Sequence, residues 1–230
     1  MDIKGIILDM DGVIMDSERF SRDDYQQLSV RYHITIDKPL MDSVLGVTGP
    51  EGDRIFAQAL GDSRLAALIR AEHRRNIRLG YAHGSIPMKR GAYELVDFLA
   101  RSHFPTALAT SNQRSAVEAA FRHTPFGAIP MTVVVTGEDV MVGKPDPEIF
   151  LTAGRKLQIP INCCLVVEDS FNGVRAAHAS GARCFMVPDT VPPTEAIASM
   201  TDSVKKDLFE VLEMVRPAVS AAAGLSDSDS

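Results

Sequence analysis

Short apolar runs that alternate with helical stretches place the strongest limit on how this chain can fold. Each run consists almost entirely of aliphatic and β-branched residues, as expected of strands that are buried on both faces. The runs lie at 3–8, 106–110, 132–136, 163–167 and 184–187. Strands of this kind, separated by helices, build βαβ units. The sequence therefore predicts an α/β fold with a parallel sheet.

Helical patterns occupy the spaces between these runs. At 92–102, for example, Leu95, Val96 and Leu99 fall on one stripe. Similar patterns lie at 115–122, 147–157 and 172–180. The segment 16–88 breaks the alternation, because it has helical patterns at 22–32, 52–60 and 64–79 but no convincing strand. A helical block placed after the first strand predicts an inserted helical domain.

Composition narrows the class of protein. The 24 basic and 30 acidic residues give a net charge of −6, which disfavours a nucleic-acid partner. No apolar stretch is long enough to span a bilayer, and the N-terminal run is interrupted by acids and followed by no cleavage site. The 3 cysteines form no C-x-x-C motif, which favours a reducing compartment. We expect a cytoplasmic monomer with no membrane partner.

Polar side chains follow the first four predicted strands. The carboxyl ends of parallel strands meet at one edge of a sheet, where α/β proteins bind their ligands. Four acids, a hydroxyl, an amide and a lysine are therefore expected to gather there. They are Asp9, Asp11, Ser111, Asn112, Lys144, Glu168 and Asp169.

This set of side chains favours phosphoryl transfer. Four crowded carboxylates require a cation or raised pKa values, and oxygen ligands without His or Cys suit Mg²⁺. Lys144 would supply a positive charge to a phosphoryl group, and Ser111 and Asn112 would donate to its oxygens. A carboxylate can itself accept the phosphoryl group. Each motif alone also fits a helix cap or a turn, so the prediction depends on all four occurring together.

The four motifs together resemble those of the haloacid dehalogenase superfamily, in the branch with a helical cap inserted after the first motif. The resemblance extends over about 3–207 and is specific for the superfamily but not for the substrate. It implies a Rossmann-like parallel sheet core with an inserted α-helical cap domain. The motifs are DMDGV at 9–13, ATSN at 109–112, GKPDPEIF at 143–150 and VVEDSFNG at 166–173.

The resemblance also implies a role for each site residue. Asp9 would be the nucleophile, and Asp11 would protonate the leaving oxygen and then activate water. Ser111 would hold the phosphoryl group with Asn112 beside it, and Lys144 would screen the charge between this group and Asp9. Mg²⁺ would be held by the carboxylates of Asp9 and Asp169 and by the backbone carbonyl of Asp11, with Glu168 near it or bound to it.

Other activities of the superfamily fit this sequence less well. Dehalogenases lack the second acid of the first motif, which is Asp11 here. Phosphonate hydrolases use a cap lysine, and this chain has none between Lys38 and Lys89. β-Phosphoglucomutases carry a histidine early in the cap and an arginine after a Gly-Val-Ser loop. The matching stretches, 16–24 and 46–50, contain neither, although Arg54 follows shortly after.

We therefore predict a Mg²⁺-dependent phosphatase that acts on a small soluble phosphomonoester: a sugar phosphate, a polyol phosphate or a nucleotide. A sugar phosphomutase and a catalytically degenerate binding module are the alternatives. The predicted divisions are a core at 1–15 and 89–216, a cap at 16–88 and a flexible acidic tail at 217–230. Thr48 and Arg54 are the candidate cap contacts to the substrate.

Overall fold

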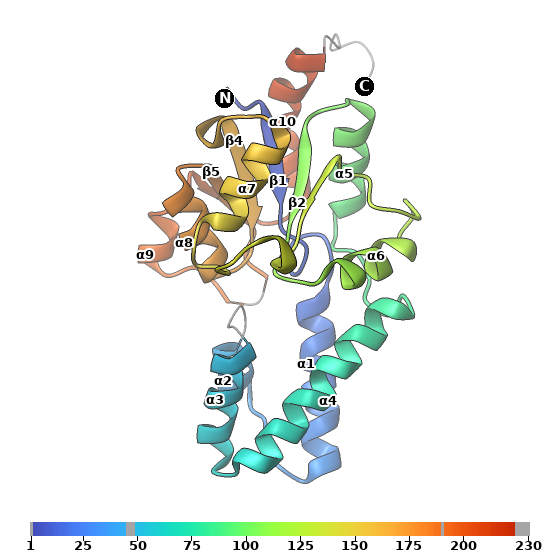
Figure 1. Ribbon diagram of the computed structural model, residues 1–230, viewed down its shortest axis with the longest axis vertical. Coiled ribbons are helices and arrows are strands. Elements are labelled where there is room, and N and C mark those ends of the chain that lie inside the picture. The colour runs from blue at the N-terminus through green and yellow to red at the C-terminus, as the bar shows by residue number, and fades with distance from the viewer. Residues whose placement is uncertain (1, 45–48, 190, 224–230) are drawn as a thin grey trace.

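The computed structural model describes residues 2–44, 49–189 and 191–223. Within these residues the chain is built around a sheet of six strands (Figure 1). The strand order is β3-β2-β1-β4-β5-β6, and each neighbouring pair is parallel. The predicted parallel α/β sheet is therefore confirmed. The strands are β1 (Gly5–Leu8), β2 (Thr106–Ala109), β3 (Val133–Val135), β4 (Cys164–Glu168), β5 (Arg183–Met186) and β6 (Ser203–Val204).

Helices cover both faces of the sheet. One face packs against α5 (Ala92–Arg101), α6 (Arg114–Arg122) and α10 (Leu208–Ala223). The other packs against α7 (Glu148–Leu157), α8 (Phe171–Ser180) and α9 (Glu195–Ala198). The short 3₁₀ helices η1 (Gly137–Asp139) and η2 (Ile161–Cys163) lie in the loops before α7 and β4.

The central strand β1 shows why its residues are apolar on both faces. Ile6 and Leu8 belong to the hydrophobic cluster with α5 and α10, whereas Ile7 belongs to the cluster with α7 and α8. All three side chains are fully buried. Burying each contributes roughly 1.5–3 kcal/mol. This packing fixes the end of β1, and therefore the start of the polar loop at Asp9.

Four helices form a separate cap beside the carboxyl ends of the strands (Figure 1). They are α1 (Ser17–Tyr32), α2 (Lys38–Ser43), α3 (Gly49–Leu60) and α4 (Ser63–Ala82). Their hydrophobic cluster is distinct from the two clusters of the sheet and includes Tyr25, Leu28, Phe56 and Ile69. The inserted helical cap is therefore confirmed.

A buried polar chain joins two of the cap helices. The His73 ring on α4 hydrogen-bonds Asp24 at 2.6 Å through Nδ1 and Ser21 at 3.1 Å through Nε2. The same ring stacks on Tyr25, with the ring centroids 3.9 Å apart. Because each polar atom in this chain has a partner, the network fixes α1 against α4 without leaving a buried group unsatisfied.

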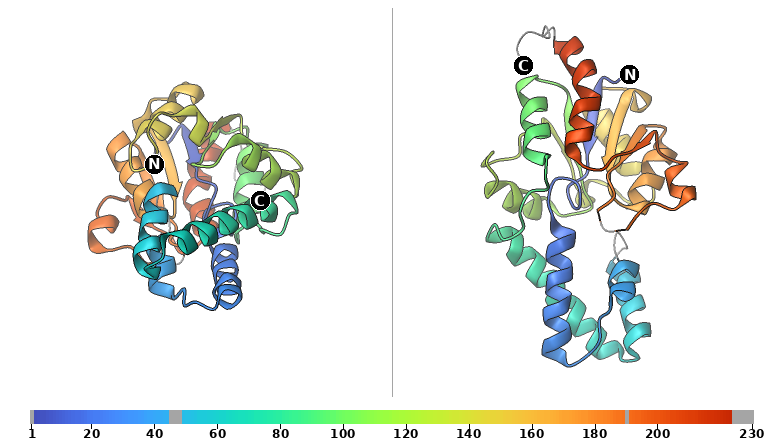
Figure 2. Two further views of the ribbon diagram at one scale, coloured as in Figure 1. Left: turned by 60° about the horizontal axis from the view of Figure 1, so that its bottom comes forward. Right: turned by 180° about the vertical axis from the view of Figure 1, so that it is seen from behind.

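The polypeptide leaves and re-enters the core through two adjacent segments. An antiparallel bridge pairs Met15 with Met88, and Lys89 N donates to Ile14 O at 2.8 Å. Figure 2 shows both segments passing between the sheet and the cap. The cap is therefore attached through a hydrogen-bonded pair of chains. Bending of these linkers stays a prediction.

The C-terminal helix corrects one predicted boundary. α10 continues through Pro217 to Ala223, and Val219 is fully buried against the sheet. The flexible tail predicted at 217–230 is therefore wrong for 217–223, and 224–230 lie outside the described residues. Pro217 lies inside this helix and its side chain is exposed. Among the described helices, none has the length and apolar character needed to cross a membrane.

Candidate active site

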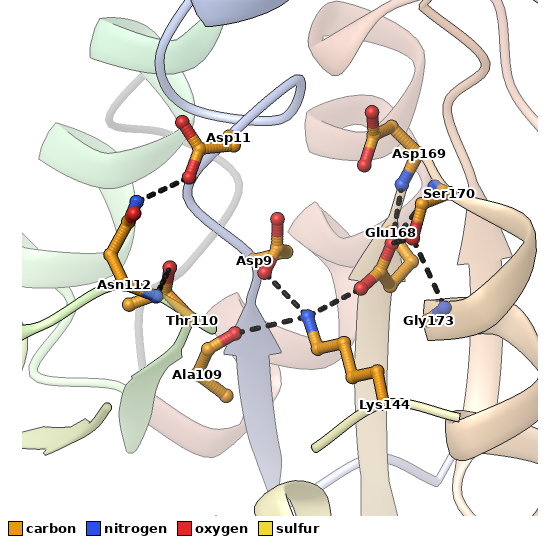
Figure 3. A network of polar contacts seen from close by, with 10 residues as sticks. All are labelled: Asp9, Asp11, Ala109, Thr110, Asn112, Lys144, Glu168, Asp169, Ser170 and Gly173. Atoms are coloured by element: carbon orange, nitrogen blue, oxygen red, sulfur yellow. Dashed lines mark hydrogen bonds and ion pairs between the residues drawn. The ribbon is translucent and has the colours of Figure 1, made fainter. Parts of the chain in front are cut away.

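The polar residues that follow β1, β2 and β4 line one side of a cavity of about 480 Å³ between the sheet and the cap. Asp9, Asp11, Ser111, Lys144 and Asp169 all face this cavity. They come from four separate segments of the chain, and Figure 3 shows most of them around the end of β1. The structure thus brings these predicted site residues together at the carboxyl edge of the sheet.

Lys144 is the link between the first and the last motif. Its Nζ donates to Asp9 Oδ1 at 2.5 Å and to Glu168 Oε1 at 2.6 Å (Figure 3). Burial alone would lower the pKa of Lys144, but the charges of Asp9 and Glu168 outweigh it and raise the pKa above 10.5. Lys144 therefore remains a cation beside the Asp9 side chain at every physiological pH.

Glu168 is the fully buried anchor of this ion pair. Its Oε2 accepts from the backbone N–H of Asp169 and of Ser170, each at 2.9 Å, and from Ser170 Oγ at 3.0 Å. A Cβ on Gly173 would lie 1.8 Å from Glu168 Oε1, so only glycine leaves room for the carboxylate. Both oxygens of Glu168 are thus occupied by donors, and the side chain positions Lys144. Ser170 also caps α8, as the alternative interpretation of this motif expected.

Three carboxylates form an acidic cluster beside Lys144. Asp9, Glu168 and Asp169 each offer an oxygen within 4.8 Å of the others, a spacing that can hold a metal ion. The turn at Gly12 has a φ of +71°, and a Cβ there would lie 2.0 Å from Asp169 Oδ2. Glycine therefore permits both the left-handed turn and the close approach of Asp169 to the first motif.

The charge on this cluster is unfavourable in the protein alone. Burial raises the pKa of Asp9 from 3.8 to about 7, and repulsion from Glu168 and Asp11 adds to it although Lys144 opposes it. Burial and the charges of Glu168 and Asp9 raise the pKa of Asp169 well above 3.8. A bound divalent cation would relieve this repulsion, and oxygen donors of this kind suit Mg²⁺.

Asp11 is held by two neutral donors. Asn112 Nδ2 donates to its Oδ2, and the Tyr81 hydroxyl on α4 of the cap donates to its Oδ1. Burial, with Asp11 nearby, raises the pKa of Tyr81 well above 10, so the phenol keeps its proton. Asn112 was predicted to bind phosphate, which stays a prediction; in the structure its amide orients Asp11. The cap therefore contributes directly to the position of the second acid.

Tyr81→Phe should lower kcat for alkyl phosphates by about 10-fold, because one hydrogen bond to Asp11 is lost. The loss should be smaller for p-nitrophenyl phosphate, whose leaving oxygen needs little protonation. Steady-state kinetics on both substrates would measure this difference. Tyr93→Phe, an exposed change on α5, is the matched control. An equal loss on both substrates would show that Tyr81 does not act through Asp11.

The sequence did not single out two residues of the cavity region. Tyr81 was expected only within the cap segment 16–88, beyond the helical pattern at 64–79, and Glu18 of α1 lines the cavity opposite the strand ends. The predicted cap contacts differ: Arg54 forms an ion pair with Glu51 at 2.6 Å on the surface of α3, and Thr48 lies outside the described residues. Which cap side chains face the site depends on how the cap docks, and periodicity alone does not encode this.

Comparisons with known proteins agree with the site. The model of the haloacid dehalogenase-like hydrolases matches residues 3–181. Validoxylamine A 7'-phosphate phosphatase from Streptomyces hygroscopicus subsp. limoneus is 30% identical over 90% of this chain and 95% of that protein. A phosphorylated carbohydrates phosphatase from Thermotoga maritima is 32% identical over 78% of this chain and 82% of that protein.

A solved structure adds a likeness in three dimensions. CbbY from Rhodobacter sphaeroides, in complex with phosphate, superposes with a TM-score of 0.70 and 26% identity, over 91% of this chain and 96% of that one. This chain therefore belongs to the haloacid dehalogenase-like hydrolases. The assignment made from its four motifs, to this superfamily and to its phosphatases, is confirmed.

Proposed function

We propose that this chain is a Mg²⁺-dependent phosphatase that cleaves a small soluble phosphomonoester through an aspartyl-phosphate on Asp9. The substrate class is a sugar phosphate, a polyol phosphate or a nucleotide. The observation that carries this proposal is the buried Lys144 ammonium, which lies between Asp9 at 2.5 Å and Glu168 at 2.6 Å. Two further acids, Asp11 and Asp169, line the cavity beside it. The two curated relatives named above are phosphatases of phosphorylated small molecules, which supports this class.

The acids divide the chemistry between them. An Asp9 oxygen attacks phosphorus, the P–O bond to the leaving group breaks, and protonated Asp11 gives its proton to the leaving oxygen. Asp11 then takes a proton from water, which attacks the phosphoryl group and releases inorganic phosphate and free Asp9. Tyr81 and Asn112 keep Asp11 in place through both steps.

The remaining side chains hold charge and shape. Lys144 stabilises the negative charge that Asp9 and the phosphoryl group share, and exposed Ser111 at the cavity wall donates to a phosphoryl oxygen. Mg²⁺ would be held by Asp9, the Asp11 carbonyl and Asp169, and would neutralise charge on the transferring group. Glu168 positions Lys144 and the backbone of Asp169, because its two oxygens already accept hydrogen bonds from them.

The two alternatives fit the site less well. A sugar phosphomutase must also bind a second phosphate, but among the described residues that line the cavity, Lys144 is the only lysine or arginine. A degenerate binding module would have no reason to keep the acids, Lys144 and their donors in contact. Hydrolysis therefore accounts for more of the observed geometry than either alternative.

A phosphate-release assay over a panel of metabolites tests this proposal. With Mg²⁺ present, we expect release of inorganic phosphate from at least one sugar phosphate, polyol phosphate or nucleotide. β-Glucose 1-phosphate supplied with a bisphosphate activator should give no glucose 6-phosphate. Isomer formation without phosphate release would favour the mutase, and a panel without any turnover would favour the binding module.

A further inference from the structure

Glu18 is a half-buried acid that the proposed chemistry leaves unused. It lies in the first turn of α1, lines the same cavity as Asp9, Asp11 and Lys144, and comes from the cap rather than from the sheet. Its Oε2 is inaccessible to solvent and has no hydrogen-bond partner among the described residues. An unpaired buried oxygen is unfavourable by about 1–3 kcal/mol, so the protein alone does not satisfy the Glu18 carboxyl group.

The groups around Glu18 do not satisfy it. Burial, together with Asp189 and Asp11, raises the pKa of Glu18 to about 8, although Arg22 and Lys89 oppose the shift. At neutral pH the carboxyl group therefore carries a proton and can both donate and accept a hydrogen bond.

The two nearby cations are already held by other acids. Arg22 is paired with Asp42 at 3.1 Å, on α2 of the cap. Lys89 is paired with Asp189 at 2.5 Å, at the segment where the chain re-enters the core. Neither forms an ion pair with Glu18 in the structure.

We propose that Glu18 hydrogen-bonds a hydroxyl of the leaving group, and that the substrate is therefore a phosphomonoester of an uncharged polyol. This proposal rests on the phosphatase function and narrows it. Asp11 protonates the leaving oxygen, so the leaving group extends from the phosphoryl site past Asp11. Glu18 interacts electrostatically with Asp11 across the same cavity. It is thus placed to contact the part of the substrate that departs.

The charge of the cavity selects against anionic leaving groups. Asp9, Asp11 and Asp169 line it, and Lys144 is bound to Asp9 and Glu168. A carboxylate or a second phosphate on the leaving group would meet acids and no uncommitted cation among the described lining residues. A hydroxyl group has no such penalty, and the Glu18 carboxyl group, which lines the same cavity, can hydrogen-bond it.

Three substrates and the variant Glu18→Ala test the contact. The probes are glycerol 3-phosphate, with hydroxyls on its leaving group, phosphoglycolate, with a carboxylate, and p-nitrophenyl phosphate, with neither. The wild type should prefer glycerol 3-phosphate to phosphoglycolate by about 10-fold or more in kcat/KM. Glu18→Ala should lose about 10- to 100-fold on glycerol 3-phosphate, mainly in KM, and less than about 3-fold on p-nitrophenyl phosphate.

Two controls separate contact from folding. Glu18→Gln, which has the shape of the protonated acid, should stay within about 3-fold of the wild type on glycerol 3-phosphate. Glu94→Ala, an exposed change on α5, should alter none of the three substrates. Melting temperatures of all variants report whether each is folded. A wild type that prefers phosphoglycolate, an unchanged Glu18→Ala, or an equal loss on all probes would overturn the proposal.

A binding measurement keeps this inference separate from the phosphatase function. If the wild type releases no phosphate from any probe, the phosphatase proposal fails, but calorimetry with glycerol 3-phosphate still tests Glu18. Asp9→Asn should bind this ester about 10-fold more tightly than Asp9→Asn combined with Glu18→Ala. Equal binding by the two variants would overturn the contact itself.

Discussion

Replacing Asp9 by asparagine is expected to lower kcat for phosphate release by at least about 10⁴-fold, because the amide oxygen is too weak a nucleophile to accept the phosphoryl group. The fold should persist, since Lys144 still has Glu168 as a partner at 2.6 Å. Phosphate release under saturating substrate and Mg²⁺ would measure the loss. Asp23→Asn, an exposed change on α1, is the matched control and should retain full activity. More than a tenth of wild-type activity in Asp9→Asn would remove Asp9 as the nucleophile.

The same variant has a characteristic stability profile. In metal-free protein the folded pKa of Asp9 is about 7, against an ordinary value of 3.8. Below pH about 4 the carboxyl is protonated in both folded and unfolded chains and contributes nothing. Between about 4 and about 7 only the unfolded chain ionises, so the wild type loses stability as the pH rises.

Asparagine does not titrate, so the melting temperature of Asp9→Asn relative to the wild type should increase from pH 4 to pH 7 and then level off. Thermal unfolding in the presence of a chelator would show this. A difference that is flat over this range, or that favours the wild type as the pH rises, would mean that burial of Asp9 does not disfavour its charge.

Removing divalent cations should abolish phosphate release, and Mg²⁺ should restore it. The physical reason is the acidic cluster, in which burial and mutual repulsion hold the pKa values of Asp9 and Asp169 above 3.8. A cation between these carboxylates would also stabilise the folded state by mass action, by about 2.7 kcal/mol at 100 times its dissociation constant. The melting temperature should then rise by roughly 5–10 °C.

Asp169→Asn provides the test of where the cation binds. This variant should lose most of the Mg²⁺-dependent rise in melting temperature, whereas Asp23→Asn should keep it. Thermal unfolding at increasing Mg²⁺ concentration measures both. Chelator-resistant hydrolysis would contradict the metal requirement, and a full thermal shift in Asp169→Asn would place the cation elsewhere.

Much of the core could be predicted because its signals are local. The strand β1 is a continuous apolar run, and the acids at its end follow directly in the sequence, so Asp9 and Asp11 could be identified from the letters alone. Parallel pairing then brings the ends of β2 and β4 beside β1 without further information. Other elements carry weaker signals. β6 has only two residues, and α10 continues through Pro217, a residue type that usually ends a helix.

The finer geometry of the site depends on contacts between distant segments. Tyr81 reaches Asp11 across 70 positions of the chain, and no local pattern distinguishes it from other cap residues. From the sequence, Asn112 could equally have faced the phosphoryl group. In the structure its amide donates to the Asp11 carboxylate, and only the position of that carboxylate decides this. The proposed metal and phosphate roles follow from residue type, whereas the assignment of each donor to its acceptor requires coordinates.

The two paired segments that attach the cap would allow the whole cap to be replaced by another inserted domain. Asp16 N donates to Pro87 O and Lys89 N to Ile14 O, each at 2.8 Å, so the excised ends would already be adjacent. A hairpin turn of about two residues could rejoin them without moving β1. Removing the cap would remove Tyr81 and Glu18, whereas the groups proposed for phosphoryl transfer would stay in the core. Recombination at these points would therefore change substrate selectivity and leave the sheet domain unaltered.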